Sequence, residues 1–72
     1  MNTNYDDYSN DMGYVLVRKL YLRSEPTLDS EVVTILNQND ELMIISEDSD
    51  WCNVYTASGQ EGFCKKEFIR II

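Results

Sequence analysis

The chain has 72 residues, which suffice for one small domain with a modest hydrophobic core but not for a large enclosed active site. Thirteen acidic and six basic residues give a formal net charge of −7, which disfavours binding to nucleic acid or anionic membranes and favours a basic partner. With no histidine and two cysteines, the chain lacks the residues for the usual zinc sites and for a disulfide-rich scaffold, so we expect no metal and no cofactor.

The N-terminus shows no targeting or membrane segment. It is polar and acidic where a signal peptide is basic and then apolar, and no apolar run approaches the ~18 residues that span a bilayer. As written, the chain is expected in the cytoplasm. A fragment of a larger protein could instead belong to the cell wall or the extracellular space.

Residues 1–13, MNTNYDDYSNDMG, carry three aspartates and no basic residue. Such a polar, acidic segment cannot bury enough apolar surface to fold, and it is predicted to be a flexible N-terminal tail. The domain itself is expected to comprise residues 14–72.

Residues 14–23 are rich in β-forming side chains and predict one long strand or two strands joined at a bulge. Leu20 and Leu22 occupy alternate positions and are expected in the core, whereas Tyr21 between them faces outward. A polar turn with the only proline of the chain follows. Arg23 is expected to stabilise this turn by pairing with a neighbouring carboxylate.

The rest of the chain alternates short β-rich runs with turn signals. Asparagines in residues 37–40 tolerate the left-handed conformation of a tight reversal, and Ala57-Ser58-Gly59 predicts the loop of a hairpin. Five to six short antiparallel strands without a long helix predict an all-β fold, a small barrel. The predicted elements are strands at 32–36, 41–46, 51–56, 62–65 and 69–72, and a single helical turn at 66–68.

The order of these motifs resembles that of bacterial SH3-like (SH3b) domains from residue 19 to residue 72. LYLRSEPT stands where the family has LNVRSGPS, and similar matches are SEVVTILNQNDELMII, DSDWCNV, EGFC and KKEFI. Glu25, Thr34 and Asn39 occupy positions where the family often has glycine. The resemblance implies an SH3-like barrel that binds peptidoglycan peptides or other short extended peptides without catalysis.

Aromatic residues are the main candidates for a ligand site. Trp51, Tyr21 and Tyr55, together with Phe63 and Phe68, could form a shelf on which a peptide lies, because aromatic rings give large contact areas at low entropic cost. The alternative is that some of these rings belong to the core. Phe68 in particular is expected to cap the bottom of the barrel.

Glu47, Asp48 and Asp50 form an acidic loop just before Trp51. Their carboxylates could attract a lysine, an arginine or a peptide amino terminus, although a solvated loop that only confers solubility is the favoured interpretation. Acid–base catalysis would require one buried carboxyl group with a raised pKa, whereas all carboxylates here lie in polar turns. We therefore expect a protein that is not an enzyme.

Cys52 and Cys64 face each other directly if Gly59 takes the left-handed position of the hairpin loop. Side chains paired in this way lie about 4.5–5.5 Å apart at Cβ, so the two thiols could form a cross-strand disulfide. The alternative is two reduced cysteines that fill small core positions. A register slip of one residue would put them on opposite faces. Without a histidine in the chain, neither can be a histidine-activated nucleophile.

Two functions follow from these observations. The first is a non-catalytic binding module that recognises a short peptide or a peptidoglycan peptide through an aromatic groove around Trp51. The alternative is a small acidic intracellular or phage-encoded inhibitor or immunity-type protein that binds a basic protein surface. In either case we expect a monomer or a weak dimer that associates through exposed strand edges.

Overall fold

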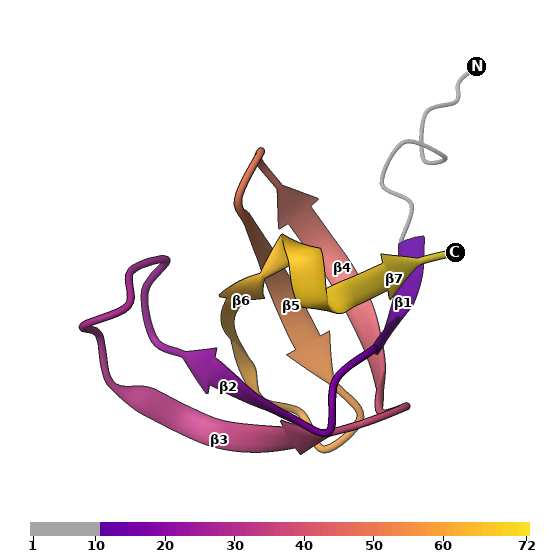
Figure 1. Cartoon of the computed structure of the whole chain (residues 1–72), viewed down its shortest axis with the longest axis horizontal. Helices are drawn as coiled ribbons and strands as arrows, with labels where there is room; N and C mark the ends of the chain where they lie inside the picture. The colour runs from indigo at the N-terminus through magenta and orange to yellow at the C-terminus, as the bar shows by residue number, and fades with distance from the viewer. Residues whose placement is uncertain (1–10) are drawn as a thin grey trace.

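A computed structural model describes residues 11–72 as a single antiparallel sheet of seven strands in the order β3-β2-β6-β5-β4-β1-β7. Figure 1 shows this sheet curled into a barrel-like shape, with β2 and β3 on one side and β1, β4 and β7 on the other. The all-β prediction with one helical turn near the C-terminus is confirmed. The elements are β1 (Asp11–Val15), β2 (Lys19–Arg23), β3 (Val32–Asn37), β4 (Glu41–Glu47), β5 (Trp51–Thr56), β6 (Glu61–Lys65), the 3-10 turn η2 (Lys66–Phe68) and β7 (Ile69–Ile71).

The sheet has more strands than the five to six predicted, because the chain bends between β1 and β2. At this bend the Leu16 N–H donates to the Phe68 carbonyl at 2.9 Å, and β1 is left to pair with both β4 and β7. β1 begins at Asp11, so it includes the last three residues of the expected tail. The remainder of that tail lies outside the described residues.

Alternating side chains of the strands build the core. In β2, Leu20 and Leu22 are buried while Tyr21 is 47% exposed, which confirms the alternation expected for this strand. Phe68 packs against the edge of the core, as expected of a capping ring. None of the polar or charged side chains among residues 11–72 is buried. The core consists of Val15, Leu20, Leu22, Leu36, Leu42, Ile44, Cys52, Val54, Cys64 and Ile69.

Two reversals use a positive φ. Asn39, in the turn between β3 and β4, has φ of 73°, and Gly59, in the hairpin loop between β5 and β6, has φ of 90°. The Asp40 carboxylate accepts a hydrogen bond from the Asn37 N–H at 2.8 Å and tightens the first turn. Asparagine is one of the few residues that tolerate this conformation, so Asn39 replaces the glycine common in the family without loss of the turn.

The two halves of the sheet meet where β6 approaches β2. Arg23 pairs with Phe63 across this junction. A Cβ atom added to Gly62 would lie 2.7 Å from the Arg23 carbonyl oxygen and 2.8 Å from Leu22 Cγ. Only glycine therefore permits this close approach, which brings the outward side chains of β2 next to those of β5 and β6. In the part of the chain that is described, no helix is long and apolar enough to cross a membrane.

Candidate functional site

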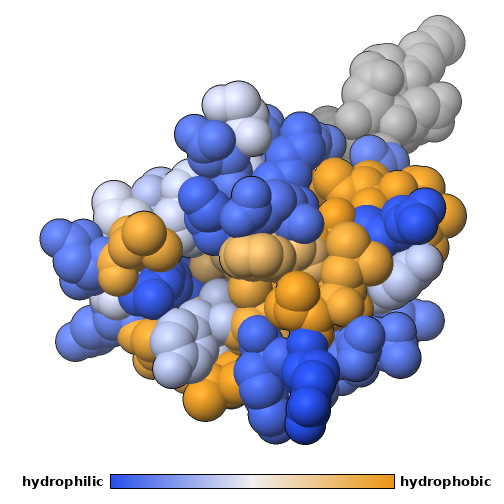
Figure 2. All heavy atoms as spheres, viewed as in Figure 1, coloured by the Kyte–Doolittle hydropathy of each residue, from blue (hydrophilic) through white to orange (hydrophobic). Residues whose placement is uncertain are grey.

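An open groove of about 410 Å³ lies beside Trp51, between β2, the β2–β3 loop and η2. Figure 2 shows hydrophobic atoms in the middle of the face that presents β2, η2 and β7, with hydrophilic atoms above and below them. Aromatic and aliphatic side chains therefore alternate with basic ones along the groove. It is lined by Val17, Leu20, Tyr21, Leu28, Trp51 and Phe68, and by the bases Lys19, Arg23 and Lys65.

Strand alternation explains which side chains reach the groove. Because Leu20 and Leu22 point into the core, the other residues of β2, which are Lys19, Tyr21 and Arg23, project outward along one face. On the neighbouring hairpin, Trp51 of β5 pairs directly with Lys65 of β6, and both are half-buried. The next pair along these strands, Cys52 and Cys64, points into the core.

Two basic groups of the groove lie against aromatic rings. The Arg23 guanidinium is 5.3 Å from the centre of the Tyr21 ring, and Lys65 Nζ is 5.5 Å from the centre of the Trp51 ring. Arg23 Nη1 also donates a hydrogen bond of 3.0 Å to the Ser30 carbonyl. The expectation that Arg23 pairs with a carboxylate is wrong, since the arginine stabilises the turn through this backbone oxygen instead.

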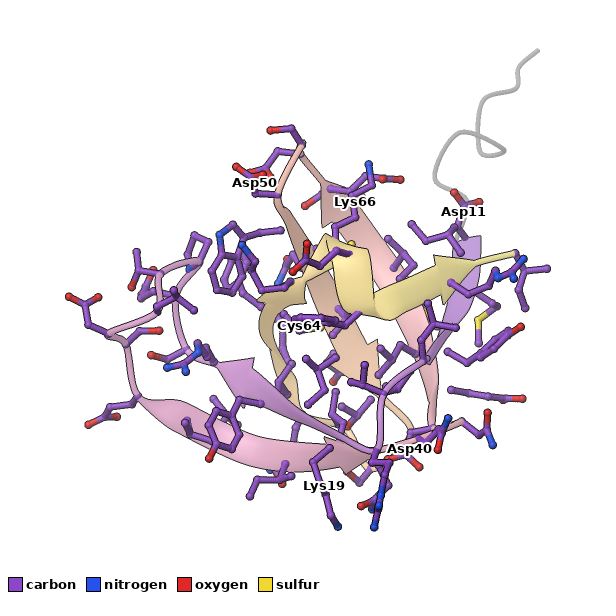
Figure 3. All side chains as sticks on the ribbon, viewed as in Figure 1. Asp11, Lys19, Asp40, Asp50, Cys64 and Lys66 are labelled. Carbon is purple, nitrogen blue, oxygen red and sulfur yellow. The ribbon has the colours of Figure 1, made fainter. Side chains whose placement is uncertain are left out.

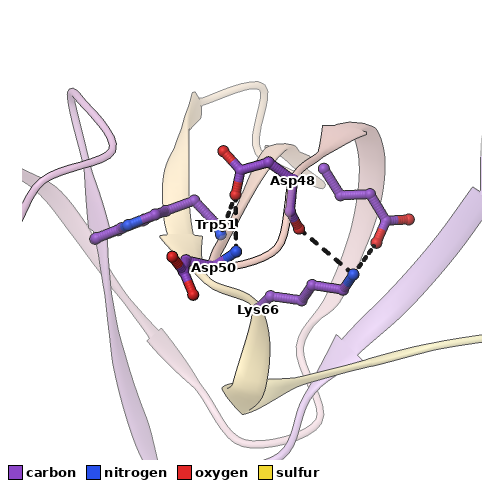
Figure 4. Close-up of polar contacts among 5 residues, drawn as sticks. Asp48, Asp50, Trp51 and Lys66 are labelled. Carbon is purple, nitrogen blue, oxygen red and sulfur yellow. Dashed lines mark hydrogen bonds and ion pairs between the residues drawn. The ribbon is translucent and has the colours of Figure 1, made fainter.

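The acidic loop on the other side of Trp51 is organised by its own hydrogen bonds (Figure 4). One carboxylate oxygen of Asp48 accepts hydrogen bonds of 2.8 Å from the N–H groups of Asp50 and Trp51. The N–H of Trp51, followed by that of Asp50, lowers the pKa of Asp48. Asp48 therefore fixes the backbone at the start of β5.

Glu47 is neutralised within the chain. Lys66 Nζ lies 2.7 Å from a carboxylate oxygen of Glu47 and 3.4 Å from the Asp48 carbonyl oxygen. The hydrogen bond to Glu47 raises the pKa of Lys66, which remains charged at neutral pH. Figure 3 shows Lys66 and Asp50 at the end of the molecule opposite Lys19.

The predicted ligand-binding residues divide into two pairs, which line two hollows, and two residues that line neither. Trp51 and Tyr21 line the large groove, whereas Glu47 and Asp48 line a smaller hollow of about 120 Å³ on the other side of Trp51. Tyr55 is 43% exposed on the outer face of β5, opposite Met43 of β4, and is not among the lining residues of either hollow in the described chain. The Asp50 side chain also lines neither hollow in the described chain.

The sequence interpretation overlooked the basic residues of the groove. The signal was present for Lys19 and Arg23, since both share the outward periodicity of Tyr21 on β2. Lys65 could be found from the hairpin register, because it pairs with Trp51. Leu28, which is 67% exposed, lies in the β2–β3 loop, and no periodicity in the sequence marks it as a groove residue.

Cys52 and Cys64 pair directly across the β5–β6 ladder, which confirms the predicted register. Both are buried free thiols, as in the reduced core alternative (Figure 3). Burial raises the pKa of Cys64 to about 12, and burial followed by the charge of Glu47 raises that of Cys52. The thiolate is the reactive form, so neither cysteine is poised to act as a nucleophile. Residues 11–72 also contain no cluster of three or more histidine, cysteine, aspartate or glutamate residues that could hold a metal ion.

Comparison with known proteins identifies the family. A family model described as bacterial SH3 domain matches residues 18–70, which include every strand from β2 to β6, most of β7 and all groove residues except Val17. The comparison with curated proteins found no significant match. The family match, which covers most of the chain, agrees with the curled antiparallel sheet and its single 3-10 turn. The chain therefore belongs to the bacterial SH3 domain family.

Proposed function

We propose that this domain is a non-catalytic module that binds a short extended peptide, such as a peptidoglycan peptide, in the groove beside Trp51. The observation that carries the proposal is the groove itself, about 410 Å³ in volume and lined by the rings of Trp51, Tyr21 and Phe68. Binding sites typically combine an apolar floor with a few polar groups that orient the ligand, and the basic residues on the walls supply such groups. Membership of the bacterial SH3 family supports a binding role.

Two features of the groove favour an extended ligand. It is partly open to solvent and is bounded by a strand and a loop, so a chain can lie in it without being enclosed. The Trp51 ring at one wall is restrained by Lys65, whose Nζ lies 5.5 Å from the centre of the ring. A ring fixed before binding loses little conformational entropy when the ligand arrives, which favours affinity.

The alternative function, binding of the acidic loop to a basic protein surface, receives less support from the side-chain contacts. Glu47 is already paired with Lys66, and Asp48 already accepts two backbone hydrogen bonds. A basic partner would have to compete with these contacts. Enzymatic activity is likewise disfavoured by the buried thiols and the raised pKa of Cys64.

The test is a titration of the domain with peptidoglycan stem peptides and with a pool of random short peptides. Trp51 fluorescence and amide chemical shifts report binding in the native protein, and calorimetry reports it in variants. Trp51→Ala is expected to weaken binding about tenfold or more, because it removes the central ring of the groove. Tyr55→Ala is the matched control, since Tyr55 is an exposed aromatic residue on the same strand, and its effect should stay below about twofold.

Two results would contradict the proposal. One is unchanged Trp51 emission together with no movement of amide signals from the groove residues for every peptide tested. The other is an equal loss of affinity in Trp51→Ala and Tyr55→Ala, which would place the ligand along β5 between these two residues and outside the groove.

A further inference from the structure

The groove differs in charge from the molecule as a whole. The chain has thirteen acidic and six basic residues, yet the lining of the groove contains three of the bases and none of the acids. Lys19 and Arg23 come from β2, and Lys65 comes from β6. The concentration of positive charge in this one hollow is not a consequence of composition.

These three basic groups have no carboxylate partner in residues 11–72, where the only ion pair within 4.0 Å joins Lys66 to Glu47. Lys19 Nζ donates to the neutral Asn37 amide oxygen at 2.8 Å, and Arg23 donates to a backbone carbonyl. Lys65 lies over the Trp51 ring. A guanidinium has five N–H donors and an ammonium has three, so each group retains donors for a ligand.

We propose that the peptide recognised by this groove carries a carboxylate next to an apolar side chain. The proposal rests on the peptide-binding function given above and specifies the chemistry of the ligand. The apolar side chain packs on the rings of Trp51 and Tyr21, and the carboxylate accepts charge-assisted hydrogen bonds from Arg23 and Lys65. An uncharged peptide would offer no charged acceptor to the remaining N–H donors of Arg23 and Lys65.

The negative net charge of the domain does not oppose this recognition at close range. At physiological ionic strength, charges are screened over about 8 Å, so acids elsewhere on the surface act weakly on a ligand in the groove. Among the nearby acids, Glu47 pairs with Lys66 and Asp48 bonds to backbone N–H groups, whereas Asp29 and Glu67, which are adjacent in sequence to the groove residues Leu28 and Phe68, are exposed to solvent. No carboxylate lines the groove in the described residues, so the charged groups nearest to a bound ligand are Lys19, Arg23 and Lys65.

Three pools of peptides test the inference. The peptides are acetylated and amidated hexapeptides with random apolar residues around one fixed central position, which is Glu, Gln or Lys. The full-length domain is expected to bind the Glu pool about fivefold more tightly than the Gln pool, and the Lys pool most weakly. A fourth pool, with Gln at the centre and a free C-terminal carboxylate, shows whether a terminal carboxylate serves as well as a side chain.

Charge-removing variants locate the effect. Lys65→Gln and Arg23→Gln are each expected to weaken binding of the Glu pool about fivefold and to reduce its preference over the Gln pool. Arg70→Gln is the matched control, because Arg70 is exposed on β7 and does not line the groove, and it should change affinity less than twofold. Arg23→Gln also removes the bond to Ser30, so Lys65→Gln gives the cleaner result if Arg23→Gln is less stable.

The outcomes separate this inference from the proposed function. If no pool binds, both are overturned. If the Gln or Lys pool binds at least as tightly as the Glu pool, peptide binding stands and carboxylate recognition is overturned. If Arg70→Gln causes the same loss as Lys65→Gln, the preference reflects overall charge instead of contacts in the groove, and the inference is again overturned.

Discussion

The two sides of Trp51 use their charges differently. On one side, the acidic loop directs its charges into the chain, where Asp48 binds two backbone N–H groups and Glu47 binds Lys66. On the other side, Arg23 and Lys65 lie on aromatic rings and have no carboxylate partner in the described structure. A cluster of charges in a sequence therefore does not by itself identify a binding site. What matters is whether the fold has already paired those charges.

This difference predicts a division of effects. Substitutions in the acidic loop should change the stability of the domain and leave peptide affinity nearly unchanged, whereas substitution of Lys65 should do the reverse. Substitution of Arg23 should affect both, because Arg23 also bonds to the Ser30 carbonyl. The experiments on Trp51, Arg23 and Lys65 address the groove side. The following experiments measure the stability of the β2–β6 junction, the β5–β6 hairpin and the acidic loop, which together position Trp51.

The largest effect is expected where β6 meets β2. Gly62→Ala should lower the free energy of unfolding by about 2–3 kcal/mol, because the new Cβ would lie 2.7 Å from the Arg23 carbonyl oxygen. Gly59→Ala is the matched control. It meets open space and has only the strain of a positive φ, with an expected loss of about 1 kcal/mol. Denaturant titration measures both, and an equal loss would show that the junction of β2 and β6 is loosely packed.

A smaller effect is expected at the inward pair of the same hairpin. Cys64→Ser should lower the free energy of unfolding by about 1–2 kcal/mol, because it places a hydroxyl group in an apolar core. Cys64→Ala serves as the control for the loss of the sulfur atom alone. Native Cys64 should also react slowly with iodoacetamide at pH 8, since its pKa is raised to about 12.

The sign of the pH dependence at Cys64 follows from its raised pKa. Between pH 9 and about 12 the unfolded thiol ionises while the folded thiol remains protonated, so this stabilising contribution is complete below pH 9 and is lost as the pH rises. Fast labelling at pH 8 without unfolding would contradict the buried position.

The smallest of these effects is expected in the acidic loop. Asp48→Ala should lower the melting temperature at pH 7, because the N–H groups of Asp50 and Trp51 lose their acceptor. The lowered pKa of Asp48 means that its contribution is present above pH 3.8 and is lost as the pH falls further, so wild type and variant should converge in acid. Asp50→Ala is the control. A large loss of peptide affinity in Asp48→Ala, without a change in stability, would contradict the expectation that the acidic loop affects stability and not affinity.

The fold was predicted well from the sequence because strands are recognised by the alternation of inward and outward side chains, which is a local pattern. Leu20 and Leu22 gave the inward face of β2, and Gly59 set the hairpin register that pairs Cys52 with Cys64. The separation of β1 from β2 was harder to predict. It depends on the bond between Leu16 and the Phe68 carbonyl, which come from distant parts of the chain.

The site was predicted less well for a physical reason. Trp51 and Tyr21 stand out by residue type, and both line the groove, but residue type alone also selected Tyr55, which shares the outward face of β5 with Trp51 but lies further along the strand, outside the groove. Charge was misleading in the same way, because the pairing of Glu47 with Lys66 depends on the fold. Periodicity and hairpin register mark the overlooked bases as outward-facing, but their convergence on one groove depends on the contact between β2 and β6.

The alternation along the β5–β6 hairpin has a consequence for how such a domain can diversify. Trp51 and Lys65 point to the groove, while the next pair, Cys52 and Cys64, points to the core. On this hairpin, groove positions thus alternate with core positions along each strand. Substitutions at alternate residues can therefore change ligand preference without repacking the interior. The hairpin is thus suited to display randomised binding positions in a library of variants.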